Sequence, residues 1–105
     1  MVNSSEIENI KNIIVSEYHP DKIILFGSYA RGDNKPDSDI DILVISDREK
    51  HLPRPKRGSD IRLKLAGINQ PLDILFYTHH DFEKFKSVRQ SLNSAIRMEG
   101  ILLYG

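Results

Sequence analysis

Residues 27–41 read GSYARGDNKPDSDID and directly follow the short apolar run 23-IILF-26. The run is rich in strand-forming residues and carries no polar interruption, which predicts a buried strand. The Gly-Ser pair after it starts a short helical turn that reaches residue 31, and turn-forming residues follow. Residues 39–45 are predicted to form a second strand. The stretch therefore predicts a strand, a tight turn and a second strand that opens with two aspartates.

The rest of the chain alternates helical and strand patterns. Ile7, Ile10 and Ile14 recur at three- and four-residue steps, which predicts a helix that starts at Ser4 or Ser5. The other predictions are helices over 59–68, 78–85 and 87–98, a strand over 72–77, a polar loop over 46–58, and an apolar tail over 101–104 that forms an edge strand or packs on the core. Together they predict an α/β (α+β) domain with a small mixed sheet flanked by helices.

Length and composition narrow the class of protein. The chain has 105 residues, which fits one domain over residues 1–105. Fifteen basic and fifteen acidic side chains cancel, so no overall field attracts nucleic acid or membrane. There are no cysteines, which excludes disulfides, thiolate metal sites and cysteine nucleophiles. No signal peptide or membrane-spanning run is recognisable, so we expect a cytoplasmic protein with no membrane partner.

The two aspartates at the start of the second strand are the first candidate site residues. Residues i and i+2 of a strand share a face, so Asp39 and Asp41 stand roughly 6–7 Å apart at their bases. At an effective dielectric near 20, two carboxylates at that distance repel by about 2–3 kcal/mol. A divalent cation reverses the sign of this interaction, and Mg²⁺ prefers oxygen ligands.

A third aspartate interrupts the next predicted strand, 71-PLDILFY-77. Strands disfavour aspartate by propensity and by burial, so Asp73 is out of place in a hydrophobic run. If this strand pairs beside 39–45, Asp73 completes a cluster of three carboxylates. Such a cluster suits two magnesium ions in phosphoryl-type transfer.

The Gly-Ser turn suits an anionic group. Gly27 permits close backbone approach, and Ser28 starts a helical turn with outward N–H groups and adds a hydroxyl donor. A phosphate chain could rest on this pair while the aspartates hold its metals. Arg31, one turn along, could reach a phosphate or pair with an aspartate.

In its motifs the chain resembles the polymerase-β-type nucleotidyltransferase superfamily. The resemblance is carried by Gly27-Ser28, by Asp39-x-Asp41 after ten intervening residues, and by Asp73 on a following strand. The form GSYARG…SDIDILV is similar to the minimal nucleotidyltransferases, antitoxin-like proteins encoded beside HEPN-domain partners. The similarity extends over nearly the whole chain and implies the polymerase-β-like nucleotidyltransferase fold.

The resemblance also implies a reaction and its residues. ATP would be the substrate, with Gly27, Ser28 and Arg31 at the triphosphate, and Mg²⁺ would be held by Asp39, Asp41 and Asp73. Asp73 would also help to deprotonate the incoming hydroxyl. The acceptor would be a tyrosine of the HEPN toxin, which becomes adenylylated and silenced.

Two other functions remain open at this point. The domain could neutralise its partner by binding alone, or it could be an enzyme that acts on RNA or a small-molecule hydroxyl. Direct nucleic-acid binding is not expected, because the basic run 48-REKHLPRPKR-57 lacks aromatic residues for base stacking. That run is either a solvated loop or a segment that closes over the triphosphate or docks an acidic or RNA-bearing partner.

Two histidines and four tyrosines have a structural interpretation as well as a functional one. His79 and His80 follow the third strand and are expected to form a polar helix start rather than a metal site. The tyrosines at positions 18, 29, 77 and 104 are expected to pack in the core. Tyr29 lies next to the candidate site, which leaves self-adenylylation there open.

Overall fold

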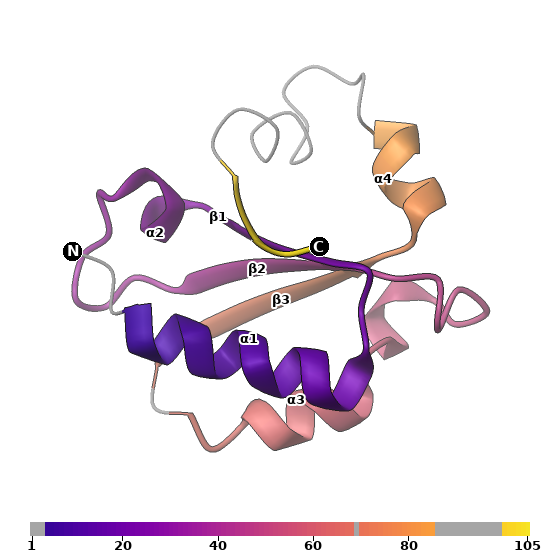
Figure 1. The fold of residues 1–105 in the computed structure, drawn as a ribbon, viewed down its shortest axis with the longest axis horizontal. Helices are drawn as coiled ribbons and strands as arrows, with labels where there is room; N and C mark the ends of the chain where they lie inside the picture. Colours follow the sequence, from indigo (N-terminus) through magenta and orange to yellow (C-terminus); the bar gives the residue numbers. More distant parts are fainter. Residues whose placement is uncertain (1–3, 69, 86–99) are drawn as a thin grey trace.

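The computed structural model describes residues 4–68, 70–85 and 100–105. Helices and strands alternate along the chain, as the sequence predicts (Figure 1). Their bounds are α1 (Ser4–Tyr18), β1 (Lys22–Phe26), α2 (Ser28–Arg31), β2 (Ile40–Ile45), the 3₁₀ turn η1 (Arg54–Lys56), α3 (Ser59–Leu65), β3 (Leu72–Tyr77), α4 (His79–Phe85) and β4 (Ile101–Tyr104). The helix predicted over 87–98 lies outside the described residues.

The strands form one mixed sheet in the order β3-β2-β1-β4. The central strand β1 runs antiparallel to β2 and to β4, whereas β2 and β3 are parallel. Parallel neighbours need a crossover, and the segment with η1 and α3 provides it. The apolar tail is therefore an edge strand, and the predicted mixed sheet is confirmed.

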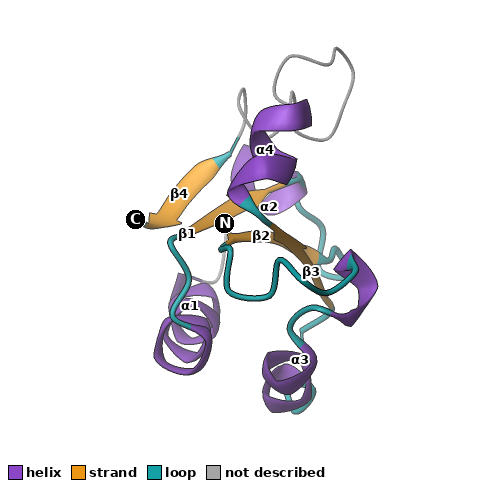
Figure 2. Cartoon of the chain, turned by 90° about the vertical axis from the view of Figure 1, so that its right-hand side faces the viewer, coloured by secondary structure: helices purple, strands orange, loops and turns teal. Residues whose placement is uncertain are grey.

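Helices cover the two faces of the sheet unequally. Figures 1 and 2 show α1 and α3 together on one face and α4 on the other. The predicted apolar stripe of α1 is confirmed, because Ile7, Ile10, Ile14 and Tyr18 are all buried in the larger core cluster. Burying an aliphatic side chain of this size stabilises the fold by about 1.5–3 kcal/mol. In the described part of the chain, no helix has the length and apolar character needed to span a membrane.

Apart from Asp41, every residue of β2 is apolar and buried, because the sheet is covered on both sides of this strand. Ile40, Ile42 and Val44 join the core under α1 and α3. Leu43 and Ile45 face a second, smaller cluster on the side of α4. A central strand with two covered faces reads as a continuous hydrophobic run. Any charge on this strand must therefore sit near its ends.

Three predicted elements begin one residue away from the predicted position, and one helix ends three residues early. The second strand begins at Ile40, so that Asp39 precedes it. The third helix ends at Leu65 and not at residue 68. The sequence Ala-Gly after Leu65 explains the early end, because glycine is a poor helix former.

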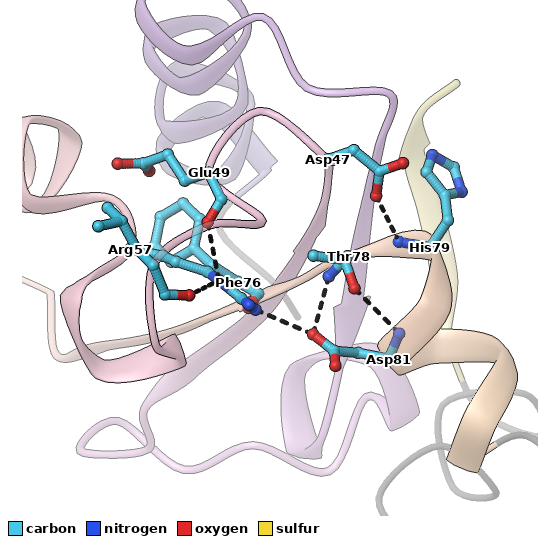
Figure 3. A network of polar contacts seen from close by, with 8 residues as sticks. Asp47, Glu49, Arg57, Phe76, Thr78, His79 and Asp81 are labelled. Atoms are coloured by element: carbon cyan, nitrogen blue, oxygen red, sulfur yellow. Dashed lines mark hydrogen bonds and ion pairs between the residues drawn. The ribbon is translucent and has the colours of Figure 1, made fainter.

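The basic run 48–57 is exposed over most of its length, as expected for a solvated loop, but its last residue is buried. Arg57 is only 8% exposed, and its guanidinium donates to the backbone carbonyl of Leu52 at 2.9 Å. It also donates to the carbonyl of Phe76 at 3.2 Å and to the Asp81 carboxylate at 2.9 Å (Figure 3). Arg48 donates to the carbonyl of Tyr18 at the end of α1. Two of the five cations in this run therefore hold the fold together.

The same run lies away from the predicted triphosphate site. It follows the carboxyl end of β2, whereas Asp41 stands near the amino end of that strand. Five residue steps along a strand span roughly 16 Å. The prediction that the run closes over a triphosphate is therefore wrong for its structured part, which includes η1 and Arg57.

Two reciprocal hydrogen bonds cap the start of α4. The Thr78 hydroxyl accepts from the Asp81 N–H at 3.0 Å, and the Asp81 carboxylate accepts from the Thr78 N–H at 3.1 Å (Figure 3). Burial by itself would raise the pKa of Asp81, but the Thr78 N–H and the Arg57 guanidinium lower it overall. His79 donates its backbone N–H to Asp47, and its Nε2 lies 2.7 Å from the Asp21 carboxylate. The histidine is a polar helix start, as expected.

Candidate functional site

The parallel pairing of β2 and β3 sets the position of two site residues. Asp41 and Asp73 are direct partners in the register, and Asp41 also pairs with Phe26 at the end of β1. Partners on neighbouring strands point to the same face of a sheet. The sheet therefore has one edge, formed by strand ends, where the amino ends of β2 and β3 meet the carboxyl end of β1. Gly27 follows β1 directly at this edge, and Asp39 precedes β2.

The carboxylates at this edge interact through their charges. The pKa of Asp41 is raised, first because the side chain is partly buried and then because Asp73 and Asp39 are negative and close. Arg31 acts in the opposite direction and favours the ionised form. Burial and like charges both disfavour an ionised carboxylate, so the site concentrates negative potential around Asp41. The three predicted acids thus lie together in the fold.

A metal would need these side chains to converge further. In residues 4–68, 70–85 and 100–105, no three His, Cys, Asp or Glu side chains converge closely enough to hold a metal ion as they stand. Asp39 and Asp73 are exposed, however, so they can change rotamer without disturbing the core. Carboxylate oxygens are the donors that Mg²⁺ prefers, and a cation would remove the repulsion around Asp41. The donor set fits the metal, and the ligand role of each aspartate stays a prediction.

Gly27 packs its backbone directly against Asp41. Its φ of 75° and ψ of −156° lie in a region that is essentially restricted to glycine. A Cβ at this position would overlap the carboxylate oxygen of Asp41. The Gly27 carbonyl accepts from the N–H groups of both Ala30 and Arg31 at 3.1 Å, which closes the turn. The sequence predicted a close backbone approach here, and the group that is approached is a site carboxylate.

Ser28 and Arg31 are the first and last residues of α2. Ser28 is half-buried beside Gly27, at the same edge as the aspartates. Arg31 places its Nε 3.1 Å from the Asp33 carboxylate, in an ion pair whose two side chains are 42% and 63% exposed. Exposed pairs contribute about 0–1 kcal/mol, so phosphate could replace Asp33 at little cost. The salt bridge and the phosphate contact are therefore compatible roles.

Two residues near the site were not recognised from the sequence as a pair. Tyr29 is only 6% exposed, and its hydroxyl accepts a hydrogen bond from Gln70 Nε2 at 2.6 Å. A phenol that is buried and bonded in this way is a poor acceptor for adenylylation, which argues against self-modification. Tyr18 and Tyr77 are also buried as expected, but Tyr104 is 39% exposed and the packing prediction for it is wrong. No local pattern marks Gln70, because its partner is 41 residues away.

Comparison with known proteins identifies the family. Residues 7–103 match the family model of the nucleotidyltransferase domain. Two curated proteins of Methanocaldococcus jannaschii, both named "Putative protein adenylyltransferase", are similar to the chain. MJ1379 is 44% identical over 101 residues, which cover 88% of this chain and 97% of the relative. MJ0604 is 49% identical over 49 residues, which cover 45% of this chain and about half (49%) of the relative.

A solved structure confirms the fold class. It is described as "Crystal structure of the toxin-antitoxin with AMP-PNP" and superposes with a TM-score of 0.60. The match covers 93% of this chain and 73% of that chain at 22% sequence identity. At this identity the likeness concerns the fold alone. Because residues 7–103 also match the nucleotidyltransferase domain, the mixed sheet with flanking helices is a nucleotidyltransferase fold.

We expect Gly27→Ala to destabilise the protein more than Gly32→Ala. Both glycines have positive φ, but a Cβ at Gly32 meets no atom within 4 Å. Gly32→Ala should cost about 1 kcal/mol of unfolding free energy from the left-handed backbone alone. Gly27→Ala should cost about 2–3 kcal/mol, because its backbone region is less accessible to alanine and Asp41 must move. Urea unfolding measures both values, and equal losses would contradict the contact between Gly27 and Asp41.

We expect Asp73→Asn to lower the pKa of Asp41, because it removes a nearby negative charge. The pKa of an unfolded aspartate is about 3.9. When the pKa in the folded state is higher, the free energy of unfolding falls as the pH rises from the unfolded pKa through the folded pKa. Asp73→Asn should therefore also increase the unfolding free energy at pH 7. Carboxyl ¹³C NMR titration measures the pKa, with Asp60→Asn on α3 as the control. An Asp41 pKa that does not respond to Asp73→Asn would show that the two carboxylates are not neighbours.

Proposed function

The chain belongs to the nucleotidyltransferase family, and we propose that it transfers AMP from ATP to a hydroxyl of a partner protein with the help of Mg²⁺. One observation carries the proposal. Asp41 is pressed against the backbone of Gly27 and stands in register with Asp73, so the Gly-Ser turn and the acidic cluster adjoin. In this proposal residues 1–105 act as a single nucleotidyltransferase domain in the cytoplasm.

Each candidate residue has a role that follows from its position. Asp39, Asp41 and Asp73 would hold Mg²⁺, two ions being the usual number for phosphoryl-type transfer. When bound, the metal neutralises charge on the phosphates and on the attacking oxygen. Gly27 and Ser28 would receive the triphosphate, because the backbone at Gly27 has no side chain to obstruct it. Arg31 would exchange its exposed partner Asp33 for a phosphate oxygen.

The reaction is an in-line displacement at the α-phosphorus of ATP. The acceptor oxygen forms a bond to this phosphorus as the bond to the β-phosphate oxygen breaks. Pyrophosphate leaves with the electron pair of that bond, and the acceptor now carries AMP. Asp73 is an exposed member of the cluster, so it can take the proton from the incoming hydroxyl.

The acceptor is proposed from the relatives and from the resemblance. The M. jannaschii proteins are named protein adenylyltransferases, and the structural neighbour is described as a toxin-antitoxin with AMP-PNP. Together with the resemblance to minimal nucleotidyltransferases, they support a tyrosine of a HEPN-domain toxin encoded nearby as the acceptor. Modification of that tyrosine would silence the toxin. ATP is the proposed nucleotide for the same reasons.

The decisive assay combines the protein, Mg²⁺, ATP labelled at the α-phosphate and the product of the neighbouring gene. We expect label on that partner with the wild type. With Asp39→Asn, Asp41→Asn or both, we expect a loss of about a thousandfold or more, because the metal-holding charge is removed. Asp60→Asn serves as a matched control, since it removes an exposed carboxylate on α3, outside the candidate site. Mass spectrometry of the partner identifies the modified residue.

Other outcomes separate the rival functions. If no label appears and the Asp39→Asn, Asp41→Asn double variant still suppresses toxicity, the protein is a binding antitoxin. Label that appears on RNA or on a small molecule instead of the partner would assign a different acceptor. Chelation with EDTA should abolish transfer, and full activity in EDTA would contradict the role of the metal.

A further inference from the structure

A hydrogen bond joins α2 to the segment that leads into β3. Gln70 Nε2 donates to the Tyr29 hydroxyl at 2.6 Å, across 41 residues of chain. Tyr29 directly follows Ser28 and is buried in the larger core cluster, against which Leu72 at the start of β3 also packs. Gln70 is only partly exposed and lies three residues before Asp73. One side-chain contact thus connects the Gly-Ser turn with the strand that carries the third aspartate.

A second hydrogen bond extends this connection to the start of β2. The N–H of Ile40 donates to the carbonyl of Pro71 at 2.8 Å. Ile40 lies between Asp39 and Asp41, and Pro71 is next to Gln70. The Tyr29–Gln70 bond and the Ile40–Pro71 bond therefore tie together all three segments that bear candidate site residues. Of these two bonds, only the first is made by side chains and can be removed by substitution.

We propose that Tyr29 and Gln70 are positioning residues for nucleotidyl transfer: their hydrogen bond fixes the separation between the Gly27-Ser28 turn and Asp73. The inference rests on the proposed function, since both ends of the link are residues of that site. In-line displacement needs the phosphate and the acceptor oxygen aligned to within a fraction of an ångström. The Gly27-Ser28 turn would receive the triphosphate, and Asp73 would accept the proton. Loss of a bond that holds these two segments together would disturb this alignment.

A simpler explanation is that a buried phenol needs a hydrogen-bond partner. Leaving such a hydroxyl unpaired is unfavourable, so the pair would stabilise the fold whether or not it aligns the site. The two explanations differ in what a loss of the bond does to catalysis. A role limited to stability predicts a lower unfolding free energy with unchanged turnover at temperatures well below the melting temperature. A positioning role predicts a fall in kcat in a protein that remains folded.

The test uses Tyr29→Phe, Gln70→Met and the double variant in the labelled-ATP assay with the partner protein. Each substitution keeps the apolar bulk of the side chain and removes one member of the hydrogen bond. We expect each single variant to lower kcat by about tenfold or more, with KM for ATP changed by less than about threefold. The double variant should be no slower than the slower single variant, because both remove the same bond.

Tyr77→Phe is the matched control. Tyr77 is a buried tyrosine at the opposite end of β3, on the side of the smaller core cluster. Removing its hydroxyl should leave kcat unchanged. Urea unfolding and circular dichroism of every variant verify that the fold is retained at the assay temperature.

The outcomes separate this inference from the proposed function. If the wild type transfers label and both single variants retain its kcat, the positioning role is wrong and the pair is structural. Single-variant losses that multiply in the double variant would also overturn it, since the residues would then act independently. If the wild type itself transfers no label to any acceptor, the proposed function fails and the positioning role fails with it.

Discussion

The parallel pairing of β2 with β3 places Asp41 directly opposite Asp73, and the rest of the site depends on this register. A shift of one residue would turn one of the carboxylates to the other face of the sheet. The register is held because β2 alternates between two apolar clusters, with Ile40, Ile42 and Val44 on one side and Leu43 and Ile45 on the other. The hydrophobic core therefore determines where the charges meet.

This arrangement is unfavourable for the unliganded protein, and the proposed function gives a reason for it. Asp41 is partly buried beside two other carboxylates, which raises its pKa and costs folding energy at neutral pH. The chain offsets that cost elsewhere, through the α1 stripe and the Arg57 network at the opposite end of the sheet. A cation bound at the cluster would convert the repulsion into attraction. The Arg57 network and the candidate site lie at opposite ends of β2 and β3, and Figure 1 shows α4 and α2 at these two ends.

Local chemistry was predictable from the sequence, whereas distant pairing was not. Asp39, Asp41 and Gly27 could be selected as candidate site residues because their order and spacing are local, and Asp73 because it interrupts an apolar strand. The alternation of helices and strands followed from hydrophobic periodicity. Two of the errors at element ends arose where Asp39 interrupts the strand pattern and Gly67 interrupts the helix pattern. Arg57 looked like a loop cation because its partner Asp81 lies 24 residues later. The Tyr29–Gln70 bond was invisible for the same reason.

The most informative measurement locates the binding site of a divalent cation, which we expect at the aspartate cluster beside Gly27. Mn²⁺ can replace Mg²⁺, and its unpaired electrons broaden backbone amide NMR signals close to it. In the presence of a non-hydrolysable ATP analogue, we predict the strongest broadening at Gly27, Asp41 and Asp73, with loss of the effect in Asp41→Asn. Broadening centred instead on Asp47 and His79, at the opposite end of the sheet, would contradict metal binding by the aspartate cluster.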